Sequence, residues 1–128
     1  MKIVMRDIKF RGYNRKNNVW LYGFYLQNRG AHFVVPDEFA DGKSWDDYEI
    51  DPATLGQYLG HHDDCDFYEG DIVEDEWGQR YSIKWLEDTQ SFCLYDTKTG
   101  YAPMDGSQLT VVGNIHETPE LLAGDTTD

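Results

Sequence analysis

The chain is a series of short apolar and aromatic runs that turn residues interrupt every few positions. Ile8, Phe10 and Gly12 alternate with residues whose side chains carry polar groups, which is the period of two typical of a β-strand. The run at residues 19–27 is rich in aromatic side chains, which pack well on a pleated surface. Asn-rich residues 14–18 lie between the two runs and are typical of a turn. The start of the chain therefore predicts a β-hairpin.

The same pattern continues along the chain and predicts more short strands. Pro36 ends a third run at residues 32–35, because Pro cannot donate a hydrogen bond to a ladder. Later runs are separated by Gly-containing turns and lie at residues 68–73, 81–85, 91–95 and 109–115. Short, closely spaced strands favour a small barrel or roll. We predict a mainly β fold with N-terminal antiparallel strands and a C-terminal SH3-like small barrel.

Two segments combine an N-capping side chain with Pro, a combination that favours the first turn of a helix. They are Asp51-Pro52 and Thr118-Pro119. Gly56 and Gly60 follow the first segment and should keep its helix short. The fold should therefore contain one or two short helical turns.

The length of 128 residues fits one domain, or two very small ones that share a core. We expect an N-terminal β region at residues 1–60, an SH3-like region at 61–122 and a flexible tail at 123–128, together forming one compact unit. Residues 37–51 should form an irregular acidic loop within the first region. Aromatic side chains should hold this loop to the fold, and they are Phe39, Trp45 and Tyr48.

The charges are unevenly distributed. The net charge is -13, from 24 acidic and 11 basic residues. It divides into +6 for residues 1–36, -14 for residues 37–88 and -5 for residues 89–128. Most of these charges should face solvent, but such a division can also be satisfied between subunits or by an oppositely charged partner. We therefore expect a homo-oligomer.

No pattern in the chain predicts a catalytic or metal site. The loop at residues 61–66 has ligand-type side chains, but neighbours in an extended loop point in different directions and cannot converge on one ion. Acidic neighbours disfavour the thiolate of Cys65, and Cys93 lies in an apolar run. There is no phosphate-binding glycine motif. We expect a protein that is not an enzyme and has no cofactor or metal.

Composition also limits where in the cell the protein is expected and which classes of partner it is expected to bind. No apolar run is long enough to span a membrane, and the first residues lack the apolar core of a signal peptide. We therefore expect a cytoplasmic protein with no membrane partner. A basic strand at residues 6–16 suits nucleic acid, but a net charge of -13 repels DNA. Direct nucleic-acid binding is thus not expected.

Four segments carry a resemblance to a known family. They are residues 6–11, 56–60, 68–73 and 112–122, in this order and spacing. With them the chain resembles the YopX family of phage and prophage proteins. The resemblance implies a phage or prophage origin in a bacterial host, a mostly β fold with an SH3-like C-terminal part, and self-association. It implies no activity. The turn at residues 61–67 is shorter and more acidic than the family pattern.

Several motif residues should serve the backbone and the packing of the fold. Glycines give the chain conformational freedom, tyrosines pack, and carboxylates accept hydrogen bonds from turns. These residues are Gly56, Gln57, Tyr58, Gly60, Tyr68, Glu69, Gly70 and Asp71. We assign them a structural role.

Acidic side chains beside aromatic ones suit a protein interface, with the rings as anchors and the charges steering the approach. The candidate residues are Asp46, Asp47, Glu49, Asp63, Asp64, Glu74, Asp75, Glu76 and Trp77. We expect a phage accessory protein that binds a host or phage protein, with mimicry of DNA as a sharper version. The alternative is an oligomeric protein that binds or sequesters a small ligand such as a nucleotide. Its site would lie between subunits, where the N-terminal bases meet an aromatic wall.

Overall fold

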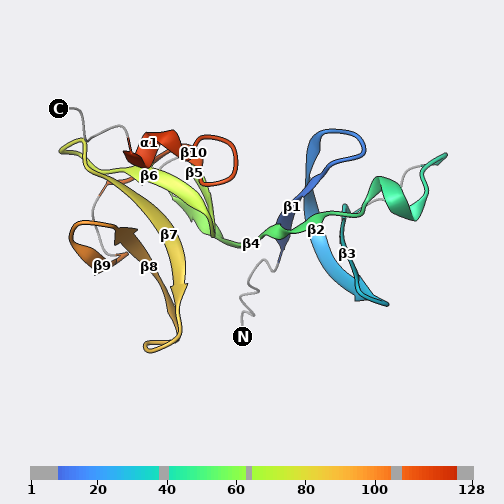
Figure 1. Cartoon of the computed structure of the whole chain (residues 1–128), viewed down its shortest axis with the longest axis horizontal. Coiled ribbons are helices and arrows are strands. Elements are labelled where there is room, and N and C mark those ends of the chain that lie inside the picture. The colour runs from blue at the N-terminus through green and yellow to red at the C-terminus, as the bar shows by residue number, and fades with distance from the viewer. Residues whose placement is uncertain (1–8, 38–40, 63–64, 105–107, 124–128) are drawn as a thin grey trace, which may run out of the picture. The chain divides into compact units, whose positions relative to one another are not determined.

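The computed structural model describes residues 9–37, 41–62, 65–104 and 108–123 (Figure 1). Its strands are β1 (Phe10–Asn14), β2 (Val19–Asn28), β3 (Ala31–Val35), β4 (Asp51–His62), β5 (Cys65–Tyr68), β6 (Asp71–Glu74), β7 (Arg80–Leu86), β8 (Ser91–Asp96), β9 (Gly100–Pro103) and β10 (Thr110–Asn114). They form two five-stranded antiparallel sheets, in the orders β3-β2-β1-β4-β5 and β10-β6-β7-β8-β9. The prediction of a mainly β fold is confirmed. The chain divides into two compact units, Met1–Gly60 and His61–Asp128.

The predicted N-terminal hairpin is present in the first unit. β1 and β2 pair antiparallel from Phe10 opposite Gly23 to Asn14 opposite Val19. β2 then turns through Arg29, whose φ of 52° is left-handed, and pairs with β3. The three runs predicted at the start of the chain therefore correspond to β1, β2 and β3 of this sheet.

The helix predicted after Asp51-Pro52 is wrong, because this segment is the start of β4. The capping contacts do form, since the Asp51 side chain accepts the backbone N–H of Ala53 at 3.1 Å. The hydroxyl of Thr54 then accepts the backbone N–H of Tyr13 at 2.8 Å. This contact lies where the β1–β4 register shifts. Pairing with β1 thus outweighs the local helix signal, and the capping contacts build an irregularity in the sheet.

The acidic loop is held to the first unit by backbone pairing as well as by a ring. A 3-10 turn, η1 (Trp45–Asp47), is followed by Tyr48 and Ile50, which are both 4% exposed. The backbone N–H of Val34 donates to Tyr48 at 3.0 Å, and that of Ile50 donates to His32 at 2.9 Å. Tyr48 therefore holds the loop as predicted. Phe39 lies outside the described residues.

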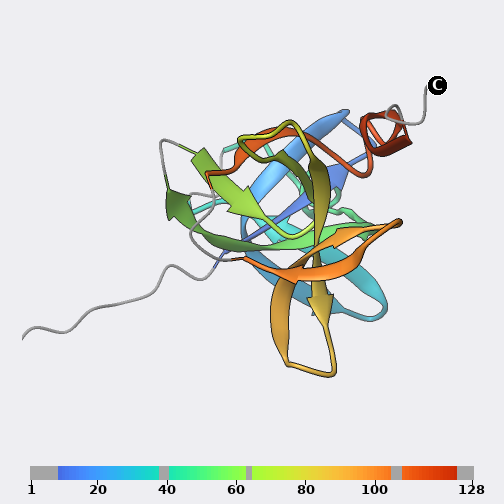
Figure 2. The same cartoon turned by 90° about the vertical axis from the view of Figure 1, so that its left-hand side faces the viewer.

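The second unit is built on the sheet that contains β6, β7 and β8 (Figure 2). Its buried core includes Ile72, Val73 and Ile83, each at most 1% exposed. Burying one such side chain contributes about 1.5–3 kcal/mol. Among the described residues β9 and β10 remain edge strands, so this sheet is not closed. The SH3-like barrel is therefore not confirmed and stays a prediction.

A short helix, α1 (Glu120–Ala123), follows Thr118-Pro119, and this helical turn is confirmed. The described part of the chain contains no helix of the length and hydropathy needed to cross a membrane.

Candidate functional site

A buried asparagine in the first unit ties the acidic loop to the β1–β2 turn. Asn14 is 1% exposed. Its side-chain N–H groups donate to the backbone carbonyls of Glu49 at 2.7 Å and Asp46 at 3.2 Å. Its side-chain oxygen accepts the backbone N–H of Asn17 at 2.7 Å. One amide therefore connects two segments that are about thirty residues apart in the sequence.

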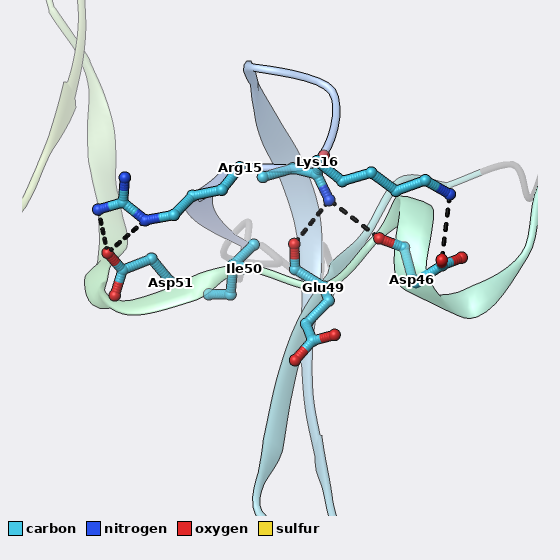
Figure 3. A pocket seen from close by; sticks show the side chains of 7 residues that line it. Arg15, Lys16, Asp46, Glu49, Ile50 and Asp51 are labelled. Atoms are coloured by element: carbon cyan, nitrogen blue, oxygen red, sulfur yellow. Dashed lines mark hydrogen bonds and ion pairs between the residues drawn. The ribbon is translucent and has the colours of Figure 1, made fainter.

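Basic side chains of this turn pair with the acids of the loop (Figure 3). The Lys16 ammonium lies 3.1 Å from a carboxylate oxygen of Asp46 and 2.9 Å from one of Asp47. The Arg15 guanidinium lies 2.5 Å from a carboxylate oxygen of Asp51. Exposed pairs of this kind add little to stability. Their main effect is to neutralise these acids within the unit.

The pKa values of this cluster shift in the direction that keeps it ionised. The backbone N–H of Ser44 is the main cause that lowers the pKa of Asp47, and the Ser44 hydroxyl is the main cause for Asp46. Lys16 lowers both values further, and its own pKa is raised, mainly by Asp47. These groups therefore hold one another in the charged form.

A shallow hollow of about 500 Å³ lies beside this cluster. Its lining includes Arg15, Lys16, Asp46 and Asp51, which already pair with one another (Figure 3). The Glu49 carboxylate points away from these cations (Figure 3). The structure thus brings the predicted residues Asp46, Asp47 and Glu49 into one loop, but two of the three carboxylates are engaged by the same unit.

The division of the chain into units changes the distribution of charge. The first unit, Met1–Gly60, holds eight acidic and eight basic residues. The second unit, His61–Asp128, holds 16 acidic and three basic residues. The first unit is thus electroneutral, and the second carries the whole net charge of -13.

The turn between β6 and β7 in the second unit displays an exposed tryptophan. Trp77 is 77% exposed. A carboxylate oxygen of Asp75 accepts the backbone N–H groups of Trp77 at 3.0 Å and of Gln79 at 2.9 Å. The backbone N–H of Asp75 donates to Gln79 at 2.9 Å, and that of Gly78 donates to Asp75 at 3.1 Å. The predicted residue Asp75 therefore builds the turn that presents Trp77.

The two other acids predicted in this turn have different surroundings. Glu74 pairs with Arg80 at 3.2 Å across the hairpin. Glu76 is exposed beside Trp77. Of the three acids, Glu76 is thus the one that the structure leaves exposed to solvent.

A larger hollow of about 730 Å³ lies in the same unit, beside Trp77. Side chains of β7 and β8 line it, among them Ser82, Lys84 and Tyr95. The sequence reasoning missed this site. In a strand that spans residues 80–86, Ser82 and Lys84 lie on the face opposite Tyr81 and Ile83 by alternation. The polar side chains on that face of β7 were the one sequence feature that could have indicated the hollow.

The motif around Gly70 joins strands of the second unit. The Asp71 side chain is 2% exposed and accepts the backbone N–H of Tyr68 at 2.8 Å. Gly70 has a φ of 93°, which favours glycine, and its N–H donates to Ile83 at 3.0 Å. The carbonyl of Gly70 accepts the N–H of Ile115 at 2.9 Å. These residues thus fix the entry of β6.

The motif in β4 lies against the first strand. Gly56 is opposite Arg11 and Gln57 is opposite Phe10. The backbone N–H of Tyr58 donates to Lys9 at 2.9 Å, and the Lys9 ammonium lies 4.4 Å from the centre of the Tyr58 ring. Gly60 has a φ of 133° and ends the first unit. These contacts therefore join β4 to the first strand and support the structure of the sheet.

The loop predicted at residues 61–66 is wrong for its described residues, because His61 and His62 end β4 and Cys65 begins β5; Asp63 and Asp64 lie outside the described residues. His61 pairs with Asp66 at 2.9 Å. In the described ranges no three His, Cys, Asp or Glu side chains gather as a metal site would require. Cys65 and Cys93 are free thiols.

Comparison with known protein families gives a match. The family described as YopX protein matches residues 9–123, which is nearly the whole chain. No curated protein sequence matches.

Proposed function

Because this chain belongs to the YopX protein family, we propose that it is a non-enzymatic phage-type accessory protein that binds a host or phage protein through its acidic second unit. The observation that carries this proposal is the coincidence of two features in that unit. It holds the whole net charge, and it displays Trp77 on a hydrogen-bonded turn.

The chemistry of the turn indicates a basic partner surface. Exposed aromatic side chains on rigid supports are typical anchors of protein interfaces, since they bury a large area at little cost in conformational entropy. The surrounding carboxylates raise the association rate with a basic surface. In the first unit Lys16 already pairs with Asp46 and Asp47 and offsets part of their charge, so these acids contribute less to the proposed interface.

The experiment uses the full chain as bait for lysate of bacterial cells and then measures affinity for the purified captured protein. Trp77→Ala should weaken binding by about thirtyfold or more, as expected for an interface anchor. Glu76→Lys should slow association, whereas Asp88→Lys makes the same charge change at an exposed position on the β7–β8 turn and should bind like wild type. Unfolding temperatures should confirm that each variant is folded. The proposal fails if no captured protein depends on either Trp77 or Glu76.

DNA mimicry is the finer form of the same proposal. A mimic occupies a DNA-binding surface, so double-stranded DNA should displace the protein from its captured partner in proportion to the DNA concentration. Retention of the complex in excess DNA rejects mimicry and leaves protein binding standing.

We also propose that the protein self-associates through β2 of the electroneutral first unit. Tyr22, Phe24 and Leu26 alternate along one face of β2 and are 48%, 60% and 42% exposed. Because the first unit has no net charge, two copies repel each other less when they meet through this unit than through the acidic second unit.

Sedimentation tests this proposal. Wild-type protein should sediment as an oligomer, and Phe24→Asp should shift it to monomer because a carboxylate would be buried in the contact. Val19→Asp is the matched control, because Val19 is 43% exposed and lies on the other face of β2 by alternation. A monomeric wild type, or an equal effect of both variants, contradicts it.

A further inference from the structure

The hollow in the second unit has the dimensions of a small-molecule site. Its volume of about 730 Å³ falls within the range of roughly 300–1,000 Å³ found for ligand pockets. Trp77 and Tyr95 contribute aromatic rings to its lining, and Ile115 and Leu122 contribute aliphatic surface. Such a lining suits a planar apolar group.

A buried hydroxyl in this lining has no hydrogen-bond partner in the part of the chain that the structure describes. Ser82 is 1% exposed, and its Oγ makes no hydrogen bond to any described residue. In the sheet register Ser82 lies between Ile72 and Tyr95 on the neighbouring strands. Buried polar atoms almost always have a hydrogen-bond partner, and leaving one without a partner destabilises the fold. A polar atom of a ligand in the hollow would supply the missing bond.

The hollow also brings together most of the basic residues of the second unit. The second unit has three basic residues, and two of them, Lys84 and Lys98, line this hollow. Lys84 lies two residues after Ser82 on β7, and its ammonium is 4.3 Å from the centre of the Tyr95 ring. The one acid of the lining, Asp96, accepts hydrogen bonds from the N–H and hydroxyl of Thr99. In a unit with 16 acids, this placement favours an anionic ligand.

We propose that the hollow binds a small planar anion with the chemistry of a nucleoside monophosphate. Its ring packs against Trp77 and Tyr95, one polar atom bonds to the Ser82 hydroxyl, and its anionic group pairs with Lys84 and Lys98. This goes beyond the binding of a protein partner. It also places the ligand within one copy of the second unit, instead of between subunits as the sequence suggested.

The test titrates the full chain with adenosine 5′-monophosphate, with adenosine and with inorganic phosphate, using calorimetry and thermal unfolding. The monophosphate should bind most tightly and should raise the unfolding temperature, because a ligand of the native state stabilises it. Adenosine lacks the anion and phosphate lacks the ring, so each should bind at least tenfold more weakly. Equal binding of phosphate and the monophosphate would identify a simple phosphate site and overturn the proposal.

Two variants separate a ligand site from a structural role. Ser82→Ala should weaken monophosphate binding about three- to tenfold, which corresponds to one neutral hydrogen bond. It should not lower the unfolding temperature of the free protein, since the hydroxyl has no partner to lose. Lys84→Gln should weaken binding of the monophosphate but not of adenosine. Ser91→Ala, at an exposed position on β8, is the control for binding and should leave the affinity unchanged; its hydroxyl does bond to Thr89, so a small fall in the unfolding temperature is expected there.

The proposal is overturned if the monophosphate does not bind, or if Ser82→Ala lowers the unfolding temperature without affecting binding. Neither Ser82→Ala nor Lys84→Gln alters Trp77 or Glu76. Capture of a protein partner by these two variants should therefore persist, and failure of the ligand proposal remains distinguishable from failure of the proposed protein binding.

Discussion

Replacing Asn14 by alanine is expected to lower the free energy of unfolding by about 3 kcal/mol. The side chain makes three hydrogen bonds to backbone groups, two in the acidic loop and one in the β1–β2 turn. A net contribution of about 1 kcal/mol for each bond gives this value, because the substitution removes all three and alanine supplies no replacement. The loop should then separate from the turn, and Lys16 should lose its fixed position beside Asp46 and Asp47.

Urea unfolding of the variant and of wild type measures this effect. Asn28→Ala is the matched control, because it makes the same chemical change at an exposed position of β2 and should alter the free energy by less than about 0.5 kcal/mol. A loss no larger than that of the control would show that the three hydrogen bonds of Asn14 do not stabilise the fold.

Gly113→Ala is expected to destabilise the second unit by about 2–3 kcal/mol. A Cβ atom at this position would lie 2.1 Å from the hydroxyl oxygen of Thr118 and 2.8 Å from a methyl carbon of Leu121. Thr118 cannot simply rotate away, because its hydroxyl accepts the backbone N–H of Asn114 and also lies 3.2 Å from the Asn114 carbonyl. Overpacking of this kind typically costs about 1–3 kcal/mol.

A double-mutant cycle with Thr118→Ala checks the cause. Removal of the hydroxyl should relieve part of the clash, so the double variant should be more stable than the sum of the two single losses predicts. Strict additivity would mean that the close contact with Thr118 is not the reason for the loss. The cycle also concerns the ligand hollow, because Ile115 and Pro119 line it and flank this packed turn.

Most of the strands were predictable from the sequence because each depends on a local pattern, but β4, β5 and β9 were not among the predicted runs. Period-two alternation and Asn or Gly turns located the β1–β2 hairpin and the later runs. The start of β4 was not predictable in this way. Asp51 does make the capping contact that its sequence context indicates. However, the backbone N–H of Tyr13, about forty residues away in the sequence, donates to the Thr54 hydroxyl, and the segment pairs with β1 in the sheet.

The candidate sites were only partly predictable for the same reason. The sequence identified Asp46, Asp47 and Trp77 as chemically suited to an interface. It could not show that Lys16 pairs with the first two, since this pairing depends on the packing of distant segments. Nor could it show that Ser82 would be buried without a partner, because a serine between polar and apolar neighbours in a strand usually faces solvent.

The electroneutral first unit and the strongly charged second unit imply that the two proposed surfaces respond to different solution conditions. Ionic strength screens exposed charges, with a Debye length of about 8 Å at physiological salt and about 3 Å at 1 M. Contacts steered by the carboxylates of the second unit should therefore weaken as salt rises. Apolar contact through Phe24 and its neighbours on β2 should persist. A change in salt alone should then release a bound partner while copies of the protein stay together.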